Sequence, residues 1–297
     1  MINSKGEKIY QVLINAILII MCLLAVIPIW LMAASSLTDN NLLLSSGYHM
    51  IPAKLSLEAY RYLFAKGADI GRSFLISIFI TVVGTFGSIV ITPLLAYPLS
   101  RKDFVAHNIL SFVVFFTMLF NGGMVSGYIM WTQIFHIKNS IWALIIPGLL
   151  MNAFNVILMK NYFAQNIPPA LIEAAKIDGA GEFYIFWKIV LPLSLPIMAT
   201  VGLMVGIGYW NDWTNGLYYV TKTELFSLQN YLNRINQNIQ FLASSSVAQS
   251  SGAGNTVLPS VSVRMAIAMV GCLPVMILYP FFQKYFVKGI TIGAVKG

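Results

Sequence analysis

The chain has 297 residues, of which 58% are hydrophobic and only 9% are charged. Soluble domains carry about 25% charged residues, so this composition excludes a disordered chain, a secreted disulfide scaffold and a cytosolic enzyme. The net charge is +8, but the basic residues form no dense cluster of the kind that binds nucleic acid. Cys22 and Cys272 each lie inside a long apolar run, so the sequence predicts no disulfide and no metal site.

Six stretches are long and apolar enough to cross a lipid bilayer. A hydrocarbon core about 30 Å thick needs about 20 apolar residues at 1.5 Å each, and such segments must be helical to satisfy their backbone hydrogen bonds. The sequence therefore predicts an all-α integral membrane protein with a membrane domain over 12–288. The six predicted spans are 12–34, 73–100, 109–131, 139–159, 189–211 and 265–283. Kinks are expected at their prolines, Pro28, Pro93, Pro147, Pro196 and Pro274.

An even number of spans puts both termini on one side of the membrane. Ten Lys and Arg residues fall on that side and eight on the other, so the positive-inside rule predicts that the termini are cytoplasmic. Residues 1–11, the loop 160–192 and the tail 289–297 are then cytoplasmic, and 220–262 is an external loop. Its Ser- and Gly-rich segment 242–260 has the composition of a loop rather than a domain.

The loop between the fourth and fifth spans predicts two short helices joined at a glycine. Pro169 suits the first turn of a helix, where its missing N–H costs nothing, and Gly179 suits the left-handed residue that ends one. The first helix should present a small apolar face formed by Leu171, Ala174 and Ala175. A second amphipathic helix is predicted by the apolar repeat Phe183, Phe186, Trp187 and Val190.

This loop resembles the EAA loop of permease subunits in ATP-binding-cassette (ABC) importers. The resemblance rests on Glu173-Ala174-Ala175, on Gly179 six positions after the glutamate, and on Leu191-Pro192. The fuller run EAAKIDGAGEFYIFWKIVLPLSLP matches the carbohydrate branch of that family, which has an aspartate before the glycine, an aromatic residue after it and a second proline.

The resemblance extends over nearly the whole chain. The long first external loop, the segment Trp210-Asn211-Asp212-Trp213 and the ending 287–297 look like the second permease subunit of oligosaccharide importers. Within that set the chain looks closest to the permeases of the maltose-transporter type that work with a lipoprotein and import glycan-derived oligosaccharides. The Ser- and Gly-rich segment departs from the family pattern.

The resemblance implies a type I ABC importer fold, a bacterial plasma-membrane location and a set of partners. These are a homologous second permease in a heterodimer, two ATP-binding subunits that hold the ATP and Mg, and an extracellular solute-binding lipoprotein that delivers the oligosaccharide. It also implies that the loop helix docks into the ATPase and transmits its closure through Glu173, Ala174, Ala175, Asp178, Gly179 and Phe183. A plain alternative for Glu173 is a solvated carboxylate at a helix N-terminus, and the tail 289–297 is either an ATPase contact or a frayed end.

The source of energy can be argued from residues that the sequence lacks. An ion-coupled carrier usually has ionisable groups near the middle of the bilayer, yet only Asp212 lies at the edge of a predicted span. There is no Gly-Lys pair, hence no phosphate-binding loop GxxxxGK[ST]. The chain is therefore predicted to be a non-catalytic membrane subunit with no cofactor of its own. Two alternatives stay open: an ion-driven sugar carrier, and a membrane scaffold without a transport role.

Residues that could contact a sugar are aromatic and hydrogen-bonding side chains near the spans. The first group is Trp210, Asn211, Asp212 and Trp213, for which an aromatic belt at the membrane surface is the alternative. The second group is Asn121, beside glycines that should break the third span, together with Asn152 and Asn155. A polar stripe on the second span, with Gly84 and Gly87 beside it, favours close helix packing over path lining. Its members are Thr81, Thr85, Ser88 and Thr92.

Overall fold

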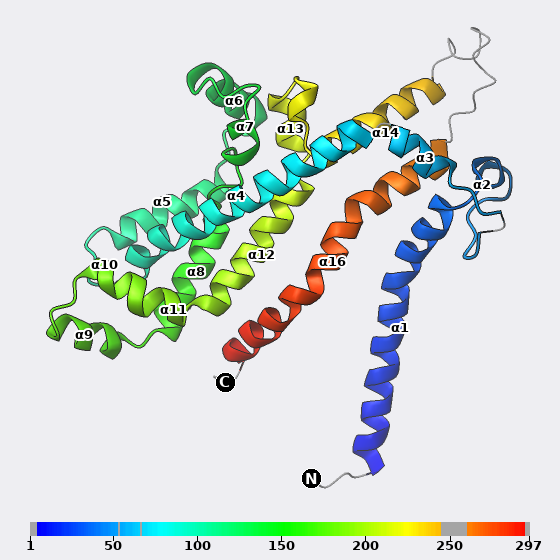
Figure 1. Ribbon diagram of the computed structural model, residues 1–297. Coiled ribbons are helices and arrows are strands. Elements are labelled where there is room, and N and C mark those ends of the chain that lie inside the picture. The colour runs from blue at the N-terminus through cyan, green and yellow to red at the C-terminus, as the bar shows by residue number, and fades with distance from the viewer. Residues whose placement is uncertain (1–4, 53, 66, 245–259, 295–297) are drawn as a thin grey trace. The chain divides into compact units, whose positions relative to one another are not determined.

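The structure is a computed structural model that describes residues 5–52, 54–65, 67–244 and 260–294. Within these ranges the regular elements are helices, and one isolated β-bridge joins Thr38 to Leu55. The predicted all-α class is confirmed. The chain divides into two compact units (Figure 1). Unit 1 contains Met1–Ile70 and Arg234–Pro274, and unit 2 contains Gly71–Asn233 and Val275–Gly297.

Unit 1 contains a long apolar helix and two short ones. Helix α1 (Lys5–Ser36) continues through Pro28 without a break, and no part of its most apolar window is buried. Helices α2 (Asn40–Ser46) and α3 (Glu58–Ala65) follow it. The side-chain oxygen of Asn40 accepts hydrogen bonds from the backbone N–H groups of Val261 and Ser262, at 3.1 and 3.4 Å. It thereby caps the first turn of α16 (Ser260–Ala294), whose N–H groups have no partner within the helix.

Unit 2 is organised around α4 (Gly67–Ser100), which continues through Pro93 and Pro98. Its small residues allow α12 (Leu195–Asn211) to approach closely. A Cβ atom added to Gly84 would lie 2.3 Å from Cζ of Tyr209, and one added to Gly87 would lie 3.0 Å from Cδ1 of Leu150. Ser88 and Thr92 on the same stripe are fully buried. The predicted role in helix packing is confirmed for Ser88, Thr92 and the glycines beside them, whereas Thr81 and Thr85 line a cavity with Gly202 and Gly206 of α12.

Two predicted spans bend sharply. The third is divided into α5 (His107–Leu119) and α6 (Gly123–Ile129), which continues as the π-helical turn η1 (Met130–Ile134), and the parts meet at 113°. Gly123 has a φ of +84° at this break, which confirms the interruption predicted there. The fifth starts at the end of a segment made of α10 (Glu182–Ile185), the π-helical turn η2 (Phe186–Val190) and α11 (Leu191–Leu193), and this segment meets α12 at 78°. Pro196 lies in the first turn of α12.

The predicted span 139–159 does not form one helix. It begins with α7 (Trp142–Ile145), breaks at Pro147 and at Gly148, whose φ is +72°, and resumes as α8 (Ala153–Asn166). Ala143, Leu144 and Ile145 are buried in a core cluster with Ile80. The apolar run therefore reflected burial inside the protein, and hydropathy alone does not distinguish this from exposure to lipid.

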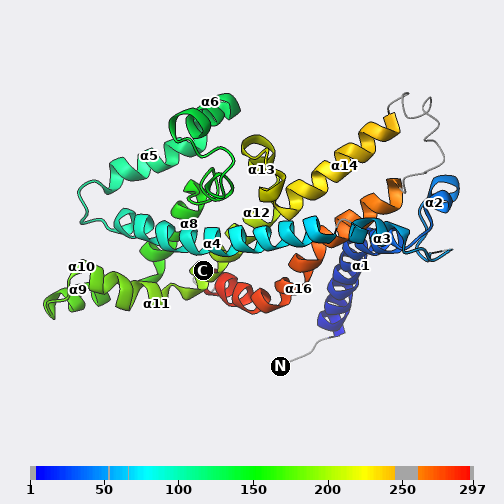
Figure 2. The same ribbon diagram turned by 45° about the horizontal axis from the view of Figure 1, so that its top comes forward.

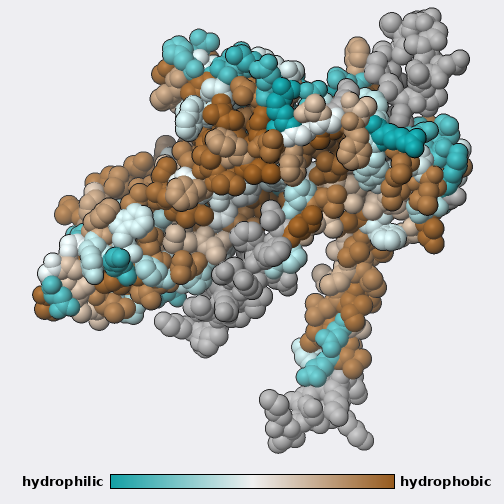
Figure 3. Space-filling model, viewed as in Figure 1, coloured by the Kyte–Doolittle hydropathy of each residue, from teal (hydrophilic) through white to brown (hydrophobic). Residues whose placement is uncertain are grey.

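By length and composition, the described residues contain two unbroken helices that could cross a membrane, Tyr10–Ser36 and Gly67–Ser100. The number rises to at most four if each bent pair is one span, and α16 adds a shorter apolar stretch, Val261–Ile277. In the view of Figure 3, hydrophobic residues cover the middle of unit 2, and hydrophilic ones gather toward its α6 end and its α9–α10 end. The count of six spans stays a prediction.

The predicted external loop 220–262 contains regular structure. After α13 (Thr214–Tyr219) and the short 3₁₀ turn η3 (Thr223–Leu225), α14 runs from Leu228 to Ser244. One face of α14 is buried, formed by Leu228, Leu232, Ile235 and Ile239. This helical spacing was present in the sequence. Most of the Ser- and Gly-rich segment 242–260 lies outside the described residues, and the predicted tail 289–297 starts inside α16, which extends to Ala294.

Replacing Gly84 by Ala should destabilise unit 2, because the added methyl group would overlap the buried ring of Tyr209, whose hydroxyl donates to Ile145 O at 2.7 Å. Overpacking of this kind costs about 1–3 kcal/mol. Thermal unfolding in detergent should show a lower midpoint for G84A. The control is G71A in the same helix, where an added Cβ meets nothing within 4 Å. Equal midpoints for the two variants would contradict the proposed α4–α12 contact.

Candidate functional site

The loop that follows α8 folds into the short helix α9, which runs from Pro169 to Ile177. Pro169 occupies the first turn, as the sequence predicted. At the other end, Gly179 has a φ of +83° and donates its N–H to Lys176 O at 3.0 Å, while the N–H of Ala180 reaches Ala175 O at 2.9 Å. These two bonds form a Schellman motif, which satisfies the last carbonyls of the helix. The predicted start and stop of the helix are confirmed.

The two faces of α9 differ from the predicted arrangement. Ile172 and Ala175 are buried in the main core cluster of unit 2, whereas Leu171, Ala174 and Ile177 are exposed, Ile177 by 86%. The expectation that Ala175 shares the outer face with Leu171 and Ala174 was wrong. The larger side chain of Ile172 is buried in the core, and Ala175, three positions later, is buried with it.

The four residues predicted to share one apolar face after Gly179 lie on two different sides of the segment. Phe186 and Val190 are buried, but Phe183 is 72% exposed and Trp187 is exposed as well. Phe186 and Val190 lie on the covered side together with Ile185, whereas Phe183 and Trp187, four positions apart, share the exposed side. The rings of Phe183 and Trp187 lie 6.0 Å apart. Figures 1 and 2 show α9, α10 and α11 together at one end of unit 2.

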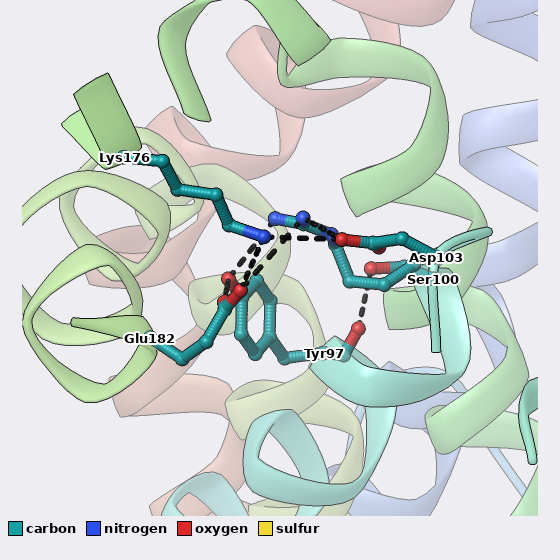
Figure 4. A network of polar contacts seen from close by, with 6 residues as sticks. Tyr97, Ser100, Asp103, Lys176 and Glu182 are labelled. Carbon is teal, nitrogen blue, oxygen red and sulfur yellow. Dashed lines mark hydrogen bonds and ion pairs between the residues drawn. The ribbon is translucent and has the colours of Figure 1, made fainter. Parts of the chain in front are cut away.

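Charged residues connect α9 and α10 to the C-terminal end of α4 (Figure 4). Arg101 binds Asp103 through two bonds, Nε to Oδ1 at 2.9 Å and Nη2 to Oδ2 at 2.6 Å. Nζ of Lys176 lies 3.1 Å from Asp103 Oδ2 and 2.7 Å from Glu182 Oε1. Tyr97 donates its hydroxyl to Glu182 Oε2 at 2.7 Å and accepts a bond from Arg101 at 3.3 Å. We call these five side chains the ionic ring.

The ionic ring contains two cations and two carboxylates, so its charges balance. The guanidinium of Arg101 holds the pKa of Asp103 well below its usual range, against an opposing effect of burial, with help from Lys176. Burial raises the pKa of Glu182, but hydrogen bonds from Lys176 and Tyr97 outweigh it and the net pKa is lowered. Both carboxyl groups are therefore ionised at neutral pH. Sequence reasoning missed this ring.

The first group of predicted sugar-contacting residues lies at the turn between α12 and α13. Trp210 is buried, with its ring edge-on to Phe74 at 5.7 Å, whereas Asn211 and Trp213 are exposed. Oδ1 of Asp212 accepts bonds from the N–H and hydroxyl of Thr214, at 3.1 and 2.7 Å. Asp212 therefore caps α13, and contact with solute stays a prediction for all four residues.

The second group lies at breaks in other helices. Oδ1 of Asn121 accepts from Gly123 N at 2.8 Å, and Oδ1 of Asn152 accepts from Phe154 N at 2.9 Å, so Asn152 is the N-cap of α8. Both side chains are exposed, while Asn155 on α8 is buried. A local structural role thus accounts for Asn121 and Asn152. Among the described residues, no three His, Cys, Asp or Glu side chains are grouped so as to hold a metal ion.

The chain is similar to membrane components of known transport systems. Residues 72–292 match the family described as "Binding-protein-dependent transport system inner membrane component". Over 294 residues, 98% of this chain and 99% of the relative, it is 39% identical to the polygalacturonan/rhamnogalacturonan transport system permease protein YtcP of Bacillus subtilis. It is 27% identical over 303 residues, 99% of each chain, to the arabinooligosaccharides permease protein AraQ of the same organism.

A solved structure is similar over the same extent. It is the crystal structure of a bacterial ABC transporter involved in the import of the acidic polysaccharide alginate. The match has a TM-score of 0.78 and 30% sequence identity, and it covers 96% of this chain and 99% of that chain.

Replacing Gly179 by Ala should loosen the end of α9, because an L-residue at a φ of +83° is strained by about 1 kcal/mol. Hydrogen exchange of a peptide over 174–182 should quicken roughly fivefold at the amides of Gly179 and Ala180. The control is Gly181→Ala, where φ is −72° and an added Cβ meets nothing within 4 Å. Unchanged exchange in G179A would argue against the Schellman motif.

Proposed function

Because this chain belongs to the family of binding-protein-dependent transport system inner membrane components, we propose that it is the membrane-spanning permease subunit of an ATP-driven importer of oligosaccharides. The observation that carries the proposal is the full-length similarity to permeases of polysaccharide and oligosaccharide transport systems, of which YtcP is 39% identical. The chain does not itself hydrolyse ATP in this proposal, and a separate ATP-binding subunit does so.

The solute we propose is an oligosaccharide derived from a polysaccharide. Support comes from the YtcP system, named for polygalacturonan and rhamnogalacturonan, and from the alginate importer. Solute would pass between this chain and a homologous second permease, after delivery by an extracellular solute-binding lipoprotein. The turn at 210–213 is a candidate part of the path, because Trp213 offers an exposed aromatic face and Asn211 an exposed amide.

The contact with the ATPase would be made by the outer face of α9 and α10, with its two anchors in the exposed side chains of Ile177 and Phe183. A short helix that presents a few apolar side chains suits docking into a groove of a partner. Glu173 is exposed on the same helix, where a carboxylate can bind a basic residue of that groove. Asp178 and Gly179 end the helix and would hold it at a fixed angle to α10.

Contact with the ATPase requires α9 to lie on the cytoplasmic side, and the topology we propose has six crossings with both termini on that side. Ile177→Cys, in a background without Cys22 and Cys272, should react with an impermeant maleimide only when the cytoplasmic face is accessible, because Ile177 is 86% exposed. Glu224→Cys, at an exposed position on η3, should react only from outside. Labelling of both positions from the same side would overturn the topology.

The coupling role of α9 can be tested in the complete transporter, with its second permease, ATPase and binding lipoprotein, in proteoliposomes. The wild type should take up oligosaccharide only with ATP, and Glu173→Lys should lower solute-stimulated ATP hydrolysis about tenfold, because it reverses the charge offered to the ATPase. The control is Glu224→Lys, the same change at an exposed position, which should keep full stimulation.

Each contrary outcome has a distinct meaning. Uptake driven by a proton or sodium gradient without ATPase would replace the proposal by a secondary carrier. Growth on the oligosaccharide after deletion of this subunit would favour a scaffold without a transport role. Full stimulation in E173K would leave the importer in place and remove Glu173 from the coupling.

A further inference from the structure

Helix α9 buries few side chains against the rest of unit 2. On its inner side, Ile172 and Ala175 are the buried residues, and both are small or medium-sized. Two apolar contacts one turn apart hold a helix against a surface but allow it to roll about its axis, since apolar contacts are not directional. Lys176 adds a charged contact, since its ammonium group reaches Asp103 and Glu182.

The ionic ring joins three separate elements through these groups. Tyr97 lies in the last turn of α4, Arg101 and Asp103 follow that helix, Lys176 lies on α9 and Glu182 lies in the first turn of α10. Figure 4 shows the side chains of Lys176, Glu182 and Asp103 directed toward one another. A displacement of α9 would therefore pull on two elements at once.

The exposure of the ionic ring indicates what it contributes. The side chains of Asp103 and Glu182 are each 54% exposed and that of Lys176 is 40% exposed. Ion pairs this accessible to water contribute little to global stability. Charged bonds with defined geometry do, however, fix orientation, and the paired contact between Arg101 and Asp103 holds the carboxylate in one position.

The ionic ring contacts α10 and the end of α4, and both of these elements continue into the core of unit 2. Glu182 begins the segment that passes through η2 and α11 into α12, and Tyr97 is part of α4. The ring of Tyr209 on α12 packs against the backbone of α4 at Gly84, and Ile89 of α4 lies against Gly202 of α12. Close packing of this kind transmits displacement because the contact has little room to deform.

We propose that Lys176 is a positioning residue, whose bonds to Asp103 and Glu182 transmit the movement of α9 to α4 and α12 together. This inference rests on the proposed function, since it assigns the route by which closure of the ATPase reaches the membrane helices. With the bonds present, α9 cannot roll, and its displacement moves both helices. Without them, α9 rolls about Ile172 and Ala175 and the displacement is lost.

The test uses the complete transporter with all partner subunits in proteoliposomes, and measures sugar molecules imported per ATP hydrolysed. Lys176→Met keeps the aliphatic stem and removes the charge, and we expect the ratio to fall about tenfold. Lys176→Arg keeps the charge and should restore at least half of the wild-type ratio. The matched control is Lys188→Met, at an exposed lysine on η2 that is not part of the ionic ring, and it should match the wild type.

The double variant K176M/E182Q separates positioning from a general loss of structure. If both residues act through one contact, the double variant should lower the ratio no further than K176M alone. Co-purification of the ATPase with each variant verifies assembly. A wild-type ratio in K176M overturns the proposal, as does a K176R variant no better than K176M. Because the wild type must show ATP-driven uptake in the same assay, failure of the proposed function is seen separately.

Discussion

The arrangement of unit 2 depends on the close approach of α12 to α4. Gly84 leaves the space that the ring of Tyr209 occupies, and the Tyr209 hydroxyl donates to Ile145 O at 2.7 Å. One aromatic side chain therefore joins α4, α12 and the end of α7. In a medium as apolar as the side chains themselves, contacts of this kind stabilise a bundle through packing and internal hydrogen bonds rather than through hydrophobic burial. The same helix α4 supplies Ser77, whose hydroxyl accepts from Leu228 N at 2.8 Å, where α14 begins.

The candidate functional residues of this chain lie where regular helices end. The Schellman motif at Gly179, the ionic ring after α4 and the cap of Asp212 on α13 all lie at breaks between helices. Backbone groups at such ends need partners, and the side chains that satisfy them also set the angle between successive segments. The span that bends by 113° follows this principle, since Asn121 accepts from Gly123 N at the break. A permease that changes shape requires joints of defined angle, and these ends are the positions where the angle is set.

Local signals in the sequence succeeded where one residue type controls the backbone. Pro169 and Gly179 predicted both ends of α9, and the glycines after Asn121 predicted the break between α5 and α6. Prediction was wrong where a face had to be chosen. Ala175 is buried with Ile172, and Phe186 is buried while Phe183 is exposed. Periodicity identifies residues that can share a face, whereas packing decides which of them are covered.

The sequence alone determined the all-α class, the apolar character of the long helices, the family and the position of the α9 turn, because hydropathy, proline and glycine act over a few residues. Only the tertiary structure decided that 139–159 is interrupted, that the apolar face of 228–244 is buried, and that the ionic ring exists. The ring joins Lys176 to a carboxylate 73 positions earlier, and Tyr97 to one 85 positions later. No local pattern encodes such pairs, since they meet only when α4, α9 and α10 have packed at one end of the unit.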